Sequence, residues 1–69
     1  MAKRDKNRLR VVRADRRITQ MDTALKSGVS LNRVWRIENG YSDPTPTEQT
    51  AIAKALKADV AEVFPQVGA

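Results

Sequence analysis

The sequence contains no cysteine and no histidine, and these two absences restrict the chemistry that the chain can perform. Without cysteine, neither a disulfide nor a thiolate metal site can stabilise the fold, which suits a reducing compartment such as the cytoplasm. Without histidine, the chain lacks the commonest metal ligand and the commonest general base. We therefore expect no metal site, no cofactor and no catalytic residue, and an enzyme is the least favoured class of function.

Long apolar runs are also missing from the chain. No segment approaches the roughly 20 apolar residues that a membrane-spanning helix needs, and the basic N-terminus lacks the apolar segment of a signal peptide. A membrane surface would attract basic charge, but no strongly apolar face accompanies that charge here. These features predict a cytoplasmic protein without membrane contact. A chain of 69 residues is long enough for one small domain.

The positive charge is concentrated in the N-terminal part of the chain. Residues 1–40 contain eleven Lys and Arg against four Asp and Glu (+7), residues 41–69 contain two against four (−2), and the sum is the net charge of +5. A basic half of this kind is typical of proteins that bind nucleic acid. We interpret residues 1–6 as a basic arm, residues 7–65 as a domain and residues 66–69 as a short tail.

The segment 28–40 is predicted to form a helix between two glycines, and the rest of the chain is arranged around it. Ser30 can accept a hydrogen bond from the first turn, and Gly40 can end the helix in a left-handed conformation. By helical spacing, the inner side consists of Val34, Ile37 and Glu38, and the outer side of Asn32, Arg36 and Asn39. Amide and guanidinium groups read purine edges in the major groove of DNA, although a polar outer face is also what any surface helix shows.

Four further helices are predicted from apolar spacing and from residues that begin or end helices, with no competing strand pattern. Their approximate ranges are 7–16, 20–27, 46–56 and 60–64. The expected N-caps of the last three are Thr19, Thr45 and Asp59. Because only a short turn separates 20–27 from the central helix, these two helices form a helix-turn-helix within an all-α fold.

Several short blocks occur in a fixed order along the chain. They are Leu9-Arg10-Val11-Val12-Arg13, Ile18-Thr19-Gln20, Gly28-Val29-Ser30, Arg36-Ile37-Glu38-Asn39-Gly40, Pro44, Ile52-Ala53-Lys54-Ala55-Leu56 and Val63-Phe64. Together they cover about residues 8–64 and resemble the lambda-repressor and Cro (XRE-type) helix-turn-helix family. The resemblance implies a compact five-helix domain that binds double-stranded DNA as a transcriptional regulator of the repressor type. It also implies a homodimer on a palindromic operator, with the helix at about 31–39 in the major groove.

The same resemblance implies roles for individual residues. The residues that would face base edges are Leu31, Asn32 and Arg36. The residues that would contact or support the phosphate backbone are Thr19, Gln20, Arg33, Asn39 and Tyr41, together with Lys3 and Arg4 of the arm. Arg13 and Glu38 would form an ion pair that joins the first helix to the central one. The dimer surface is expected near residues 59–65.

Some residues depart from the family pattern in ways that affect packing. Arg17 stands where many relatives have glycine, so a left-handed conformation there would cost roughly 1 kcal/mol. Four polar residues occupy positions that are usually apolar in relatives, namely Thr23, Ser27, Gln49 and Thr50. This predicts a hydrophobic core with few apolar side chains.

Met21 and Leu25 are apolar where relatives are usually polar, and Trp35 falls on the outer side of the central helix. The favoured interpretation is that Met21 and Leu25 contact Trp35 in a small apolar cluster outside the main core, a satellite contact, since small apolar patches are common on monomers. Trp35 could instead lie against a sugar and a thymine methyl group in the groove. As an alternative function, Met21, Leu25 and Trp35 could bind a protein partner, as in an antitoxin-like or other protein-interaction module of the same fold.

Overall fold

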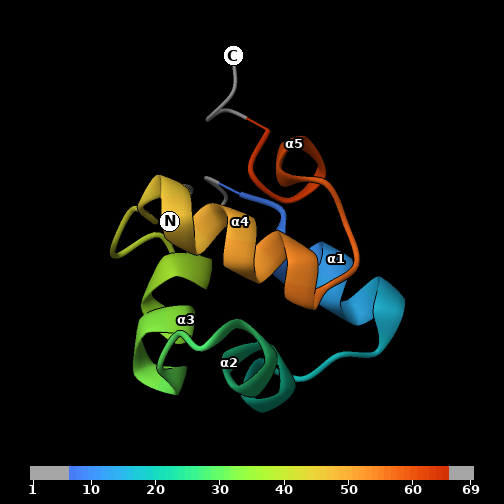
Figure 1. Ribbon diagram of the computed structural model, residues 1–69, viewed down its shortest axis with the longest axis horizontal. Coiled ribbons are helices and arrows are strands. Elements are labelled where there is room, and N and C mark those ends of the chain that lie inside the picture. Colours follow the sequence, from blue (N-terminus) through green and yellow to red (C-terminus); the bar gives the residue numbers. More distant parts are fainter. Residues whose placement is uncertain (1–6, 66–69) are drawn as a thin grey trace.

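Residues 7–65 are the part of the chain that the computed structural model describes, and they form five α-helices and no strand (Figure 1). The helices are α1 Leu9–Arg16, α2 Gln20–Ser27, α3 Leu31–Glu38, α4 Pro46–Ala55 and α5 Val60–Val63. The predicted all-α class and the order of five helices are therefore confirmed. The predicted arm at 1–6, which includes Lys3 and Arg4, and the tail at 66–69 lie outside the described residues.

Three helices begin at side chains that cap them. Thr19, Ser30 and Thr45 each accept the backbone N–H three residues further on. At α4 the cap is reciprocal, because Thr45 Oγ1 accepts the Glu48 N–H at 3.1 Å and Glu48 Oε1 accepts the Thr45 N–H at 2.9 Å. The starts of α2, α3 and α4 are thus fixed locally, as the sequence predicts.

Two other helix starts differ from the prediction. α1 begins at Leu9 because Asn7 Oδ1 accepts the Leu9 N–H at 2.9 Å and so lies ahead of the helix. Asp59 occupies the N-cap position of α5, but its side chain makes no capping hydrogen bond, so the predicted cap is wrong. The Asp59 carbonyl accepts the Glu62 N–H at 3.0 Å instead. The Glu62 carboxylate, which would complete a capping box, accepts from Arg16 Nη2 at 3.1 Å.

The core is built around α4, which crosses the middle of the domain in Figure 1 and packs against α2 and α5. The buried apolar side chains that pack together in this core are Leu9, Val12, Ala24, Val34, Ile37, Ile52, Ala53, Leu56, Val63 and Phe64. Two polar residues at usually apolar positions are accommodated by hydrogen bonds. The buried Thr23 hydroxyl donates to the Thr19 carbonyl at 2.9 Å, and Gln49 Nε2 donates to the Pro44 carbonyl at 3.3 Å.

Within residues 7–65, two residues other than glycine adopt the left-handed conformation. Arg17 ends α1 with φ 56°, and Lys57 follows α4 with φ 57°. The strained conformation that the sequence suggested for Arg17 is therefore present, whereas nothing in the sequence pointed to Lys57. None of the helices within residues 7–65 is long and apolar enough to cross a membrane.

Candidate nucleic-acid interface

The helices α2 and α3 are joined by a short turn and pack against each other, as Figure 1 shows. Gly28 makes the turn possible because it adopts φ 80°, a conformation that glycine reaches at no steric cost. Its N–H donates to the Ala24 carbonyl at 2.9 Å, which closes the end of α2. Ser30 then starts α3, so the helix-turn-helix is defined by residues at the ends of its two helices.

α3 separates its side chains into an inner and an outer face. Val34, Ile37 and Glu38 are buried, whereas Leu31, Asn32 and Arg36 are exposed. The side chains of Asn32 and Arg36 form no hydrogen bond or ion pair with any other residue in the range 7–65. Their amide and guanidinium groups are consequently available to a ligand that approaches the outer face.

The inner face of α3 is fixed to α1 by a charged cluster. Arg13 Nε donates to Glu38 Oε1 at 2.8 Å and Arg13 Nη2 donates to Glu38 Oε2 at 2.9 Å, which is a bidentate pair. Arg13 Nη1 also donates to the Ile18 carbonyl at 3.0 Å. The side chains of Arg13 and Glu38 are only 16% and 2% exposed, so the pair is largely removed from water.

Arg10 extends this cluster, and the sequence did not identify it. Its Nε donates to Glu38 Oε2 at 3.2 Å, and the side chain of Gln20 lies against the same carboxylate. Burial alone would raise the pKa of Glu38. The hydrogen bonds and charge of Arg13, followed by the side chains of Arg10 and Gln20, outweigh burial and hold this pKa below its ordinary value.

Asn39, one of the residues expected near phosphates, is bonded within the domain. Its Oδ1 accepts from Arg10 Nη2 at 3.1 Å, and its Nδ2 donates to the Trp35 carbonyl at 2.9 Å. Together with Gln20, it therefore braces the C-terminal end of α3. Thr19 is exposed at the start of α2, where its hydroxyl oxygen accepts the Asp22 N–H at 3.0 Å.

Arg33 forms a second bidentate pair, which joins α3 to the start of α4. Its Nε and Nη2 donate to Glu48 Oε2 and Oε1, both at 2.9 Å, and Nη2 also donates to the Asp43 carbonyl at 3.0 Å. The hydrogen bonds from Arg33 lower the pKa of Glu48, and those to Glu48 raise the pKa of Arg33. The guanidinium expected at the DNA backbone is thus engaged by a carboxylate, and its contact with phosphate remains a prediction.

An aromatic pair lies beside the outer face of α3. The rings of Trp35 and Tyr41 are stacked, with centroids 5.4 Å apart and planes inclined by 16°. The two side chains line a shallow pocket of about 440 Å³ together with Asn32 and Arg36. This arrangement brings four outer-face residues to one place, and the pairing across six positions was not evident from the sequence.

The favoured interpretation of Met21 and Leu25 as satellites of Trp35 remains a prediction. Met21 is 51% exposed and Leu25 is 74% exposed, while the ring contact of Trp35 is with Tyr41. The two side chains are exposed because the buried positions of α2 are Thr23 and Ala24.

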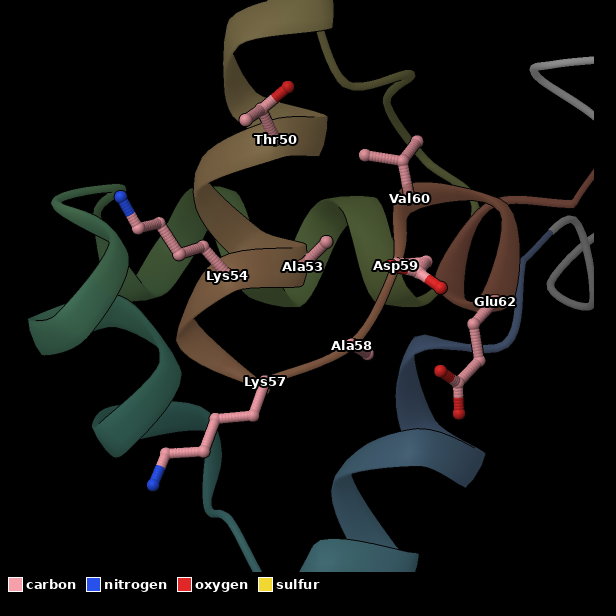
Figure 2. A pocket seen from close by; sticks show the side chains of 8 residues that line it. All are labelled: Thr50, Ala53, Lys54, Lys57, Ala58, Asp59, Val60 and Glu62. Carbon is pink, nitrogen blue, oxygen red and sulfur yellow. The ribbon is translucent and has the colours of Figure 1, made fainter.

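A second pocket, of about 600 Å³, lies where α4 turns into α5 (Figure 2). Lys54 and Lys57 extend from one side of it, and Asp59 and Glu62 lie on the other side. It therefore presents both signs of charge around a small apolar floor that includes Ala53. Part of this surface coincides with the region 59–65 that the sequence suggested for a dimer.

Comparison with known proteins finds a protein-family profile, described as a helix-turn-helix domain, that matches residues 7–64. No curated protein and no solved structure matches the chain. Within residues 7–65, no group of three or more acidic, histidine or cysteine side chains could hold a metal ion. The profile covers well over half of the sequence and the same residues fold as two helices joined by a tight turn, so the chain belongs to the helix-turn-helix domain family.

Proposed function

We propose that this protein is a sequence-specific regulator of transcription that binds double-stranded DNA and acts as a repressor, with α3 in the major groove. The observation that carries the proposal is the outer face of α3, where the side chains of Asn32 and Arg36 are exposed and have no hydrogen-bond or ion-pair partner among residues 7–65. The net charge of +5 supports it, since duplex DNA is a polyanion. The protein would act by binding and not by catalysis, in the cytoplasm, where duplex DNA is accessible.

Base recognition would be divided among three side chains of α3. Asn32 lies in the first turn, the part of a recognition helix that enters the groove most deeply in this docking mode. Its amide can pair with N6 and N7 of adenine, and Arg36, one turn further, can pair with O6 and N7 of guanine. Leu31 offers an apolar contact to a thymine methyl group.

Contacts to the phosphate backbone would hold α3 in position. Thr19 and Tyr41 are exposed on either side of the helix-turn-helix, and the arm residues Lys3 and Arg4 would add positive charge. Arg33 and Asn39 are hydrogen-bonded within the domain, and Gln20 lies against the Glu38 carboxylate. We therefore assign these three residues a supporting role that orients α3 and allows a phosphate contact at their remaining N–H groups.

We further propose that the protein binds as a homodimer to a palindrome, because one small domain covers too few base pairs for useful discrimination. The half-sites would then be centred about 10–10.5 base pairs apart. The surface of α4 and α5 supports this arrangement, because a two-fold axis would bring the lysines of one protomer (Lys54, Lys57) toward the carboxylates of the other (Asp59, Glu62) (Figure 2).

Selection from a pool of random duplex DNA, followed by sequencing of the bound fraction, tests this function. The expected result is an enriched palindrome whose half-sites contain an adenine and a guanine at a fixed spacing. A bound pool without any enriched sequence would contradict sequence-specific recognition. A single half-site without its symmetric partner would contradict the dimer alone.

An alternative function is an antitoxin-like or other protein-interaction module of the same fold. The exposed Met21 and Leu25 favour it, because they lie one turn apart on α2 and exposed apolar patches mark protein interaction sites. The discriminating experiment is purification of the native complex with measurement of its mass. A partner at fixed stoichiometry that is released by Leu25→Lys, but not by Lys26→Ala, would support this alternative.

A further inference from the structure

The stacked pair of Trp35 and Tyr41 is the feature that the assignment of base-reading residues leaves unexplained. Trp35 is 46% exposed and Tyr41 is 62% exposed, although aromatic side chains of this size usually bury most of their surface. Their stacking removes only part of this surface from water. A pair of large exposed rings beside a polar helix face indicates a contact surface for a ligand.

The backbone holds both rings in place. Gly40 adopts φ 80°, which reverses the chain after α3, and the Tyr41 N–H then donates to the Arg36 carbonyl at 2.8 Å. The Trp35 carbonyl accepts from Asn39 Nδ2 at 2.9 Å, which fixes the last turn of the helix. The aromatic pair is therefore pre-organised and needs no large rearrangement to meet a ligand.

The neighbours of the pair determine which ligand suits it. The rings share their pocket with Asn32 and Arg36, whose side-chain polar groups have no partner within residues 7–65. A ligand in this pocket must offer acceptors to a guanidinium and, immediately beside them, an apolar group to the rings. In the major groove, the thymine C5-methyl is the apolar group that base edges present, and guanine O6 and N7 are the acceptors that suit arginine.

We propose that Trp35, supported by Tyr41, is a specificity-determining residue that packs against the C5-methyl of a thymine adjacent to the base contacted by Arg36. This inference rests on the proposed DNA-binding function and extends it to one further base. Trp35 supplies the contact and Tyr41 is a positioning residue that holds the indole in its orientation. The preferred half-site therefore contains a thymine whose methyl group contributes to affinity.

The first measurement uses Trp35 as its own reporter, because it is the only tryptophan in the chain. The full chain is titrated with the selected duplex while tryptophan emission and the anisotropy of a labelled copy of that duplex are followed separately. We expect quenching or a blue shift of the emission that saturates together with the anisotropy. If anisotropy reports binding but the emission does not change, the inference is overturned and the proposed function stands. If no duplex changes the anisotropy, both fail.

The second measurement removes the methyl group alone. Each thymine of the selected half-site is replaced in turn by deoxyuridine, which differs only by that methyl. At one position the affinity of the wild-type protein should fall about fourfold, because burial of one methyl contributes ~0.8 kcal/mol and about 1.4 kcal/mol corresponds to tenfold. A selected half-site without thymine beside the guanine, or without any position sensitive to uridine, overturns the inference.

Variants then assign the methyl contact to a side chain. In Trp35→Ala the difference between thymine and uridine should disappear, and in Tyr41→Phe, which keeps a ring for stacking, it should persist. Leu25→Ala is the matched control, since Leu25 is exposed and apolar but lies on α2. Leu31 is the competing contact. Loss of the difference in Leu31→Ala, with its retention in Trp35→Ala, would assign the methyl to Leu31 and overturn the inference. Circular dichroism of each variant establishes that it is folded.

Discussion

Arg13 and Glu38 form a bidentate ion pair across 25 positions of sequence, with Nε–Oε1 at 2.8 Å and Nη2–Oε2 at 2.9 Å. The pair connects α1 to the end of α3, and Glu38 is 2% exposed. Removing one partner leaves the other charged group without compensation in a poorly solvated site. The stability of the domain should therefore depend on this contact more than on its surface ion pairs.

Replacement of Glu38 by alanine should reduce the free energy of unfolding by roughly 3–5 kcal/mol, the cost typical of breaking a buried pair. Urea denaturation followed by circular dichroism measures this change. The control is Glu62→Ala, which removes the more exposed pair with Arg16 and should cost at most about 1 kcal/mol. Equal effects of the two substitutions would show that burial does not distinguish the pairs.

Stability should also depend on pH in the acidic range, because the pKa values of Glu38 and Glu48 are both lowered in the folded state. A carboxylate with a depressed pKa contributes stability that is complete above its unfolded pKa of about 4.3 and is lost as pH falls through the folded value. Denaturation midpoints should thus be constant near neutral pH and decrease below about pH 4.3. In Glu38→Gln this decrease should be smaller, and an unchanged pH profile would contradict the assignment.

The left-handed residues can be tested with a matched set of glycine substitutions. Arg17→Gly and Lys57→Gly should each stabilise the domain by about 0.5–1 kcal/mol, since relief of left-handed strain exceeds the added chain entropy. Lys54→Gly, in the last turn of α4, should destabilise it by up to about 1 kcal/mol. Thermal unfolding compares all three. Destabilisation by Lys57→Gly equal to that by Lys54→Gly would show that its φ value carries no strain.

The helix starts were predictable because each depends on a few neighbouring residues. Thr19, Ser30 and Thr45 form caps within three positions, and the sequence displays those positions directly. Asp59 had the same local pattern, but the Glu62 N–H donates to the Asp59 carbonyl and not to its side chain, and the Glu62 carboxylate pairs with Arg16, 46 positions away. The pairing of Glu62 depends on how α5 packs against α1, which the local pattern does not contain.

The contacts around the outer face of α3 were harder to predict because they depend on how the helices pack. Arg33 was expected to face phosphate, and only the position of α4 reveals that Glu48 meets it. The stacking of Trp35 on Tyr41 requires the chain to reverse at Gly40, which a helical projection does not represent. Single side chains could be assigned to a face, but their partners could not.

Arg36→Ala should weaken binding to the selected site much more than binding to a scrambled duplex. Loss of a bidentate contact to guanine should cost roughly 1–3 kcal/mol on the selected site and much less on a scrambled duplex. Fluorescence anisotropy on the two duplexes at one salt concentration measures both losses. Lys26→Ala removes the same charge from α2, at an exposed residue to which no DNA contact is assigned, and should not change the ratio between the duplexes. Equal losses on both DNAs in Arg36→Ala would make Arg36 a phosphate contact.

The basic arm should contribute to affinity but not to sequence preference. Each phosphate neutralised by the protein adds about −0.9 to the slope of log affinity against log salt. Replacing Lys3, Arg4 and Lys6 together by alanine should therefore flatten the slope, while selection yields the same palindrome. A slope unchanged from that of the wild type would mean that the arm does not meet phosphate.

The two bidentate arginine pairs act on α3 from different helices. Arg13 of α1 holds Glu38 at the end of α3, and Arg33, near its beginning, is held by Glu48 of α4. A helix of eight residues restrained at both ends has little freedom to roll about its own axis or to slide along it. A recognition helix restrained in this way cannot shift its position to fit a DNA site that differs from the preferred sequence. In the proposed docking, a mismatch would consequently lose its full contact energy, and the protein would tolerate few variants of its site.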